Sequence, residues 1–137
     1  MSEMVVWHEA GDRFRIAIRG HEVVVDQPVW DGGGDAGPTP TELFVASLAG
    51  CVAFYAGRYL GRHGIEPGGL EVDVRFAMAE DRPARVADVE LFLRLPVEFP
   101  PEQLDRLRAV VEHCTVHNSI TQPPEVKIAL EIPQPAV

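Results

Sequence analysis

Two cysteines are the residues of this sequence whose type and number most clearly suggest chemistry. They are Cys51 and Cys114, about sixty positions apart in a chain of 137 residues. A pair of thiols can reduce a peroxide, because a thiolate attacks the O–O bond, becomes a sulfenic acid and then condenses with the second thiol to form a disulfide. The attacking thiol needs a lowered pKa, which requires a positive charge or a hydrogen-bond donor close to it. The sequence therefore predicts peroxide reduction if folding brings the two sulfurs together.

The groups that could activate a thiol are charged residues elsewhere in the chain. Arg13, Arg15 and Arg19 belong to one expected strand, and the sequence does not choose among them. Glu42 could orient such an arginine through a two-pronged ion pair. On a continuous helix, however, nine residues place Glu42 on the opposite side from Cys51 and roughly 13 Å along the axis. In the other interpretation, Glu42 is an acidic residue that stabilises the N-terminus of the helix.

Other interpretations of the cysteines stay open. A free cysteine often serves only as a small apolar side chain in a core. His113, Cys114 and His117 are spaced closely enough to suggest zinc. Cys51 would have to complete that set, and no Cys-x-x-Cys accompanies it. We therefore expect no metal site.

A long helix must position Cys51. The segment 41–62 has helical character, and no charged residue lies between Glu42 and Arg58. A helix that is apolar on every side must be buried on every side, and a chain of this length has little material to surround it. We therefore expect a second subunit to cover part of it. The expected end signals are a threonine cap and a glycine stop, namely Thr39 or Thr41 and Gly64.

A second helix must position Cys114. It is expected to begin near Pro101, because proline is favoured in the first turn, and to continue to the cysteine. Its apolar residues fall on one face by the helical period, so Cys114 should point into the core at the end of the helix. Two helices packed on one sheet could then bring the sulfurs together.

The remaining elements are strands. Three β-branched segments at 3–10, 13–20 and 21–26 predict an antiparallel meander, and alternation at 70–78 and 89–95 predicts a hairpin. Residues 31–38 form a glycine-rich loop without the lysine of a phosphate-binding loop. Residues 124–132 are expected to be the last strand. We therefore predict one α+β domain over residues 1–137, with an antiparallel sheet and two main helices on one face.

Composition limits the partners. The formal net charge is −9 and the twelve basic residues are scattered, which argues against nucleic acid. The N-terminus lacks the pattern of a signal peptide, and no uninterrupted apolar run reaches the length of a membrane span. A cytoplasmic location is expected, where two distant cysteines would rest as thiols.

Two segments carry a resemblance to a known family. The segment GPTPTELFVASLAGC, which leads into the long helix, and CTVHNSI, which follows the second helix, resemble the osmotically inducible protein C and organic hydroperoxide resistance (OsmC/Ohr) superfamily, in its OsmC-like branch. The resemblance implies an intertwined homodimer with the central helices back to back and two sites at the interface. It also implies Cys51 as the peroxidatic thiol, Cys114 as the resolving thiol, Arg13 and Glu42 as their partners, and no metal or organic cofactor. A dithiol, lipoyl-linked in the hydroperoxide-resistance branch, would regenerate the thiols.

Two functional hypotheses follow. The first is a thiol peroxidase that reduces organic hydroperoxides, with hydrogen peroxide as a further candidate substrate. The second is a noncatalytic dimeric module that binds a small hydrophobic ligand in the interface cleft, with the cysteines as core side chains. Two core-directed thiols and the sequence around each motivate the first hypothesis, and the long uncharged helix motivates the second.

Overall fold

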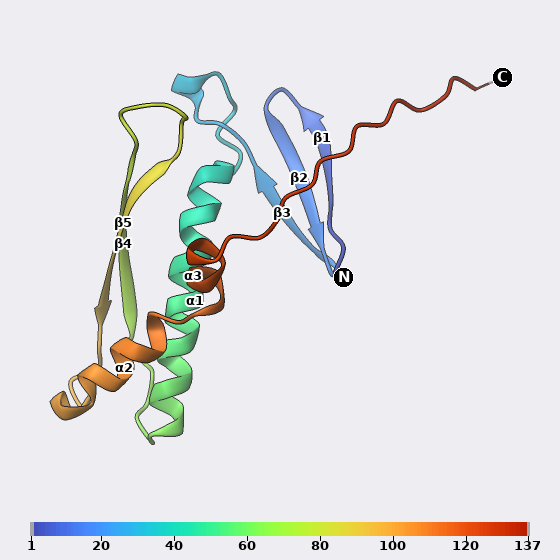
Figure 1. Ribbon diagram of the computed structural model, residues 1–137. Coiled ribbons are helices and arrows are strands. Elements are labelled where there is room, and N and C mark those ends of the chain that lie inside the picture. The colour runs from blue at the N-terminus through green and yellow to red at the C-terminus, as the bar shows by residue number, and fades with distance from the viewer. Residues whose placement is uncertain (1, 137) are drawn as a thin grey trace.

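The computed structural model describes residues 2–136, and these form two antiparallel sheets and three α-helices (Figure 1). The long helix α1 runs through the middle, with the β4–β5 hairpin along one side and the smaller β1–β3 sheet on the other (Figure 1). The strands are β1 (Val5–Ala10), β2 (Arg13–Ile18), β3 (His21–Val25), β4 (Glu71–Met78) and β5 (Val86–Arg94). The helices are α1 (Pro40–Arg62), α2 (Leu104–Val111) and α3 (Thr115–Thr121), with short 3-10 turns at Val29–Asp31 (η1) and Pro101–Gln103 (η2).

The meander and the hairpin predicted from alternation are both present. β1 pairs with β2 and β2 with β3, and a tight turn at Gly11, where φ is 53°, joins the first two. Positive φ favours glycine, because a side chain would clash there. β4 and β5 pair over nearly their whole length, with Val74 opposite Leu91. The apolar side chains of this pair therefore share the face that α1 covers.

Helix α1 begins and ends where its sequence signals predict. The Thr39 hydroxyl accepts from the Glu42 amide at 3.0 Å, and the Glu42 carboxylate accepts from the Thr39 amide at 2.9 Å. This reciprocal pair satisfies two amides that a helix start leaves unpaired. Pro40 occupies the first turn, and Gly64, with φ at 70°, follows the C-terminal end.

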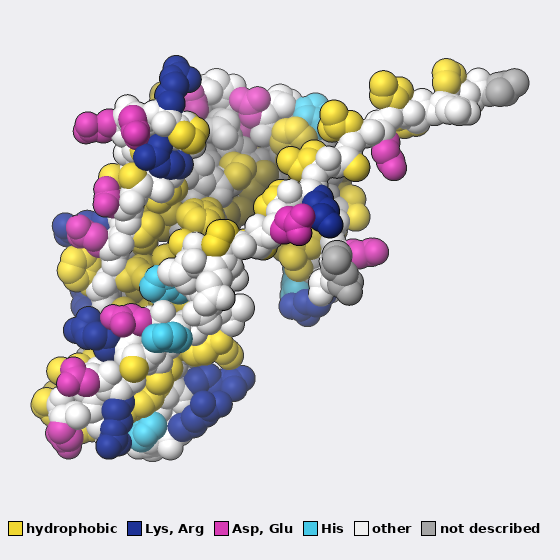
Figure 2. Space-filling model, viewed as in Figure 1, with side chains coloured by type: hydrophobic (Ala, Val, Ile, Leu, Met, Phe, Trp, Pro, Cys, Tyr) yellow, Lys and Arg dark blue, Asp and Glu magenta, His cyan; other side chains and the backbone are white. Residues whose placement is uncertain are grey.

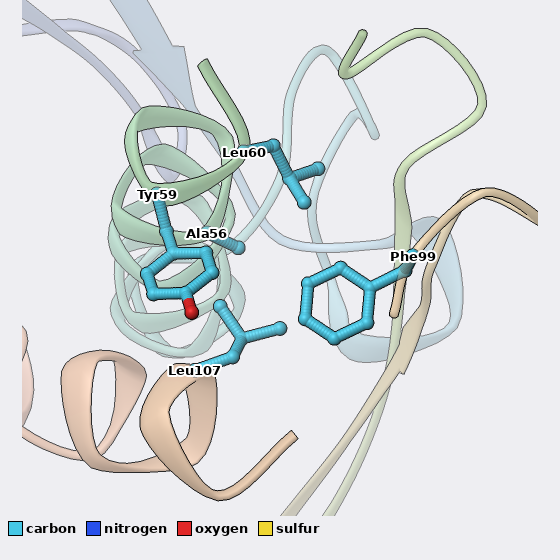
Figure 3. Close-up of a cluster of buried hydrophobic side chains, with 5 residues drawn as sticks. All are labelled: Ala56, Tyr59, Leu60, Phe99 and Leu107. Carbon is cyan, nitrogen blue, oxygen red and sulfur yellow. The ribbon is translucent and has the colours of Figure 1, made fainter. Parts of the chain in front are cut away.

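The main core lies where α1 meets α2 and the end of β5. Figure 3 shows Leu60, Ala56 and Tyr59 of α1 facing Leu107 of α2 and Phe99. The Tyr59 hydroxyl donates to the Gln103 side chain at 2.8 Å, so the polar end of this buried ring is satisfied. The core holds the second half of α1 firmly against α2.

By length and composition, α1 passes the test for a membrane-spanning helix, with a hydropathy of 1.5 over its most apolar window. The helix contains no uninterrupted apolar run of that length, but its interspersed small and weakly polar residues leave the mean hydropathy high. Core helices of globular proteins pass the same test. Here α1 packs against α2, α3, β4 and β5, which is the position of a core helix.

A buried aspartate organises the loop that leads into α1. The Asp26 carboxylate accepts from the amides of Gln27 at 2.7 Å, Ala36 at 3.0 Å and Gly34 at 3.4 Å. These hydrogen bonds, that of Ala36 foremost, lower the pKa of Asp26. A Cβ at Gly37 would lie 2.3 Å from the Val24 carbonyl oxygen, so the chain can approach this closely only at a glycine. The sequence identified the loop but not the carboxylate that holds it.

Two predictions about the sheet are wrong for the single chain. The strands form two separate sheets instead of one. The predicted last strand at 124–132 is extended but pairs with no strand of residues 2–136, and it runs away from the body (Figure 1). A strand needs neighbouring backbone to satisfy its amides and carbonyls, and alternation predicts the extended geometry without identifying that neighbour. The alternating apolar residues of this segment are 75–95% exposed, namely Val126, Ile128, Leu130 and Ile132.

Candidate active site

The two cysteine thiols meet between α1 and the start of α3. Cys114 is 0% exposed and packs with Leu48 and Val52 of α1, and Cys51 packs against the same cluster. The two thiols are close enough for Cys51 to influence the pKa of Cys114. Cys51 is partly exposed, and neither thiol is in a disulfide. Folding thus brings together two thiols that are far apart in the sequence, one accessible and one buried.

Cys114 reaches this position by a route that the sequence did not predict. The second helix was expected to extend to Cys114, but α2 ends at Val111 and a further helix, α3, begins at Thr115. Cys114 is the N-cap of α3, and its Sγ accepts from the His117 amide at 3.4 Å. Cysteine is not a usual N-cap residue, so the start of α3 carried no clear sequence signal.

The surroundings of Cys114 favour the protonated thiol. Burial raises the pKa of the Cys114 thiol, the hydrogen bond from the His117 amide lowers it, and the neighbouring Cys51 thiol raises it further. A buried thiolate would lose its hydration, which is why burial favours the neutral form. Cys114 therefore holds its proton at neutral pH and is not suited to be the attacking thiolate.

A hydrogen bond between side chains links the two segments that carry the cysteines. The Tyr55 hydroxyl and the Thr115 hydroxyl lie 2.8 Å apart. Tyr55 follows Cys51 by one helical turn, and Thr115 directly follows Cys114. Helical spacing places Tyr55 on the same face of α1 as Cys51, but the sequence contains no signal that identifies a partner for its hydroxyl.

The structure pairs Arg13 with Glu9 on its own sheet. Arg13 Nε donates to the Glu9 carboxylate at 2.9 Å, and Arg15 Nε donates to the other oxygen at 2.8 Å. The hydrogen bond from Arg15 lowers the pKa of Glu9. Arg19 lies in the turn after β2. Approach of an arginine such as Arg13 to Cys51 stays a prediction, whether from this sheet or from that of a second subunit.

The structure places Glu42 in the first turn of α1, where its carboxylate completes the capping box with Thr39. This is the second of the two roles considered for Glu42. The nine residues from Glu42 to Cys51 span roughly 13 Å of helix. An orienting role for Glu42 beside an arginine stays a prediction, and it too requires another subunit.

The two histidines near Cys114 are the residues that the sequence offered as zinc ligands. No group of three His, Cys, Asp or Glu side chains gathers among residues 2–136. The Nδ1 of His113 donates to the Ala109 carbonyl at 2.9 Å, one turn back in the same helical segment. The zinc set considered from the sequence, with His113 and His117, is therefore not assembled.

An apolar cavity of about 530 Å³ lies beside the thiols. It opens between β5, α2 and the middle of α1, and Val52 and Val111 belong both to its wall and to the cluster around Cys114. Three polar side chains, Arg108, Glu112 and His117, stand at its edge. The other walls are aliphatic or aromatic, including Leu91, Phe92, Leu93, Leu95, Leu104 and Leu107.

One face of α1 is left uncovered in the single chain. Phe54 is exposed on this face, with the Arg58 guanidinium 4.7 Å above its ring. Gly57 and Gly61 form a shallow groove next to them. Figure 2 shows further hydrophobic surface in the hollow between the β4–β5 arm and the C-terminal segment. The exposed face agrees with the expectation that a chain of this length cannot surround the helix alone, and a second subunit that covers it stays a prediction.

Comparison with known proteins gives a consistent result. A family model described as OsmC-like protein matches residues 32–129, which contain both cysteines. Among curated proteins, none matches this sequence.

Solved structures share the fold over most of the chain. A candidate osmotic stress induced and detoxification response protein from Psychrobacter arcticus is 25% identical, covers 87% of this chain and 88% of its own, and has a TM-score of 0.78. An OsmC-like protein from Mycoplasma pneumoniae is 12% identical, and the match covers 90% of this chain and 89% of that protein, with a TM-score of 0.75. An organic hydroperoxide resistance protein OsmC from Legionella pneumophila, described as a predicted redox protein, is 15% identical over 88% and 90%, with a TM-score of 0.64.

Proposed function

The chain belongs to the OsmC-like protein family, and on this premise we propose that it is a redox protein of the stress response that reduces organic hydroperoxides. One observation carries the proposal: a partly exposed thiol, Cys51, packs against the same cluster as a fully buried thiol, Cys114. A peroxide must reach the attacking sulfur, whereas the sulfur that closes the disulfide is best protected from the peroxide. The partly exposed position of Cys51 and the sealed position of Cys114 match these two demands.

The reaction follows from the two thiols. The Cys51 thiolate attacks the outer oxygen of the hydroperoxide, the O–O bond breaks, and the alkoxide takes a proton and leaves as the alcohol, with Cys51 as sulfenic acid. The Cys114 sulfur then attacks the Cys51 sulfur, the S–O bond breaks, and the hydroxide leaves as water with the Cys114 proton. The raised pKa of Cys114 keeps that proton available until this step. A dithiol, lipoyl-linked or other, reduces the disulfide, and we place the cycle in the cytoplasm, where such reductants are kept.

The proposed assembly is an intertwined homodimer. The exposed face of α1 around Phe54 and the exposed apolar segment 124–132 both support it, because each presents hydrophobic area that a second copy could cover. The partner would also supply what the single chain does not, namely an arginine, Arg13, that lowers the pKa of Cys51 and a carboxylate, Glu42, that orients the arginine. Light scattering would measure the mass in solution. A monomer at micromolar concentration would contradict the proposed assembly.

The decisive assay follows loss of cumene hydroperoxide in the presence of a dithiol. Wild type should turn over repeatedly, and Cys51→Ser should not. Cys114→Ser is the matched control, because it keeps the attacking thiol: with the dithiol left out, it should consume about one equivalent and remain as the sulfenic acid, whereas wild type forms the disulfide. Equal rates for wild type and Cys51→Ser would refute the proposed peroxidase.

A second candidate function is noncatalytic binding of a small hydrophobic ligand, and the apolar cavity of about 530 Å³ favours it. The two candidates differ in their dependence on the cysteines. A ligand held in this cavity should bind equally well to wild type and to Cys51→Ser, and Leu107→Phe should reduce its affinity by filling the space. A measurement of binding with a fluorescent fatty acid, alongside the peroxide assay, separates them.

A further inference from the structure

We propose that the hydrogen bond between Tyr55 and Thr115 positions the two cysteines for disulfide formation, so that it sets how long the Cys51 sulfenic acid survives. This inference rests on the proposed peroxidase function and deepens it. Tyr55 and Thr115 act through the cysteines and touch no substrate in this proposal, so they are positioning residues.

The position of the bond is the first argument. The two hydroxyl oxygens are 2.8 Å apart, which is a well-formed hydrogen bond. One end lies on α1 a single turn after Cys51, on the same helix face. The other end lies on the residue that directly follows Cys114. The bond therefore joins the two backbone segments that carry the sulfurs, immediately beside the sulfurs themselves.

The second argument is that the segment with Cys114 needs such a link. The cysteine lies between the end of α2 at Val111 and the start of α3, a helix of seven residues without a fully buried side chain. Val116 packs against the Cys114 cluster, and the Cys114 Sγ itself caps α3 through the His117 amide. When that sulfur becomes part of a disulfide, the cap changes. The hydroxyl bond does not involve the sulfur and can hold α3 on α1 throughout the reaction.

The third argument concerns the geometry that a disulfide demands. Its Cα atoms must lie about 4.4–6.8 Å apart, with the sulfurs in line for attack. Small misplacements of reacting groups reduce rates strongly. A link one residue from one sulfur and one turn from the other restricts both the separation and the orientation of the pair.

The consequence is a competition between two fates of the sulfenic acid. It can condense with the Cys114 thiol and release water, or it can reduce a second hydroperoxide to the alcohol and become a sulfinic acid, which dithiols do not reduce. Loss of the Tyr55–Thr115 bond should slow the first fate and leave the second unchanged. The initial attack on the peroxide should also be unchanged, because the accessible Cys51 needs no approach by Cys114.

The test compares Tyr55→Phe, Thr115→Val and the double variant with wild type, using cumene hydroperoxide. Each single variant removes one hydroxyl at nearly constant shape. Stopped-flow fluorescence and quenched samples analysed by mass spectrometry would measure sulfenic acid formation and disulfide formation separately. The net contribution of an ordinary hydrogen bond corresponds to a change in the rate constant of about 2- to 12-fold. Disulfide formation should slow by this factor in each single variant, and sulfinic acid should accumulate at correspondingly lower peroxide.

Two controls distinguish positioning from general damage. Thr115→Ser keeps the hydroxyl and should restore the wild-type rate. The double variant should be no slower than either single variant, because both changes remove the same bond. Unchanged disulfide formation in Tyr55→Phe, or effects that add in the double variant, would overturn the inference. If wild type forms no sulfenic acid at all, the proposed function fails and the inference fails with it. If wild type forms sulfenic acid and Tyr55→Phe forms the disulfide at the wild-type rate, only the inference is refuted.

Discussion

Oxidation of the thiol pair should stabilise the fold by an amount that the chain itself sets. A disulfide between Cys51 and Cys114 would close a loop of about sixty residues. The loss of freedom in the unfolded chain then corresponds to about 4 kcal/mol in the free energy of unfolding. Because both cysteines already pack in one cluster in the reduced protein, we expect the native state to need little rearrangement to form the bond, and most of this stabilisation should be realised.

Thermal unfolding measures this effect directly. For a chain of this size, 1 kcal/mol shifts the midpoint by about 3 °C, so the oxidised protein should unfold about 12 °C higher than the reduced protein. The sample would be treated with one equivalent of cumene hydroperoxide and followed by circular dichroism. Mass spectrometry would confirm the loss of two hydrogen atoms.

The single-cysteine variants are the controls for this prediction. Cys114→Ser and Cys51→Ser cannot close the loop, so their midpoints should not rise after the same treatment. Addition of a dithiol should return oxidised wild type to the reduced midpoint. A confirmed disulfide with an unchanged or lower midpoint would refute the reasoning, because it would mean that the native structure must distort to bring the sulfurs together.

Three further predictions address the fold and the thiols. Asp26→Asn should lower the free energy of unfolding at about pH 7, and the difference from wild type should shrink towards about pH 3. The pKa of Asp26 is lowered in the folded protein, so the Asp26 carboxylate stabilises the fold at pH values above its pKa in the unfolded chain. This stabilisation is lost as the pH falls through the pKa in the folded protein. Urea unfolding at the two pH values measures this, and a constant difference contradicts it. Iodoacetamide should modify Cys51 well before the buried Cys114, whose raised pKa should delay its reaction to alkaline pH; equal labelling in peptide maps would exclude this. Leu60→Ala, at a side chain that is 0% exposed, should cost about 2–5 kcal/mol in denaturant unfolding, whereas Leu104→Ala, at 46% exposure, should cost much less.

Local signals in the sequence were sufficient for the elements that depend on neighbouring residues. Helix α1 starts at a cap that Thr39 and Glu42 form between themselves, and the β4–β5 hairpin follows from alternation within each strand. Proximity of the thiols could be anticipated because the spacing of apolar residues directs both Cys51 and Cys114 into the core, although Cys114 lies beyond the end of its expected helix. These features need only short-range chemistry and one packing step.

Features that depend on distant or unusual partners were missed. Helix α3 begins at a cysteine cap, which has no common sequence signature. The partner of the Tyr55 hydroxyl, Thr115, lies sixty residues along the chain. The strand at 124–132 was expected from its own pattern, but a strand also requires a neighbour, and its pattern does not say where that neighbour is. The same limitation applies to Arg13, whose single-chain partner is Glu9.

The extended segment after α3 has a consequence for the newly made chain. An apolar alternation of this kind is prone to stack with identical copies into open-ended aggregates. Charged residues occupy intervening positions of the segment, at Glu125, Lys127 and Glu131, and prolines stand on both sides of it, at Pro123, Pro124, Pro133 and Pro135. Such residues act as gatekeepers, since charge repels stacked copies and proline ends backbone pairing. These residues therefore disfavour open-ended stacking of the segment while it is exposed in the newly made chain.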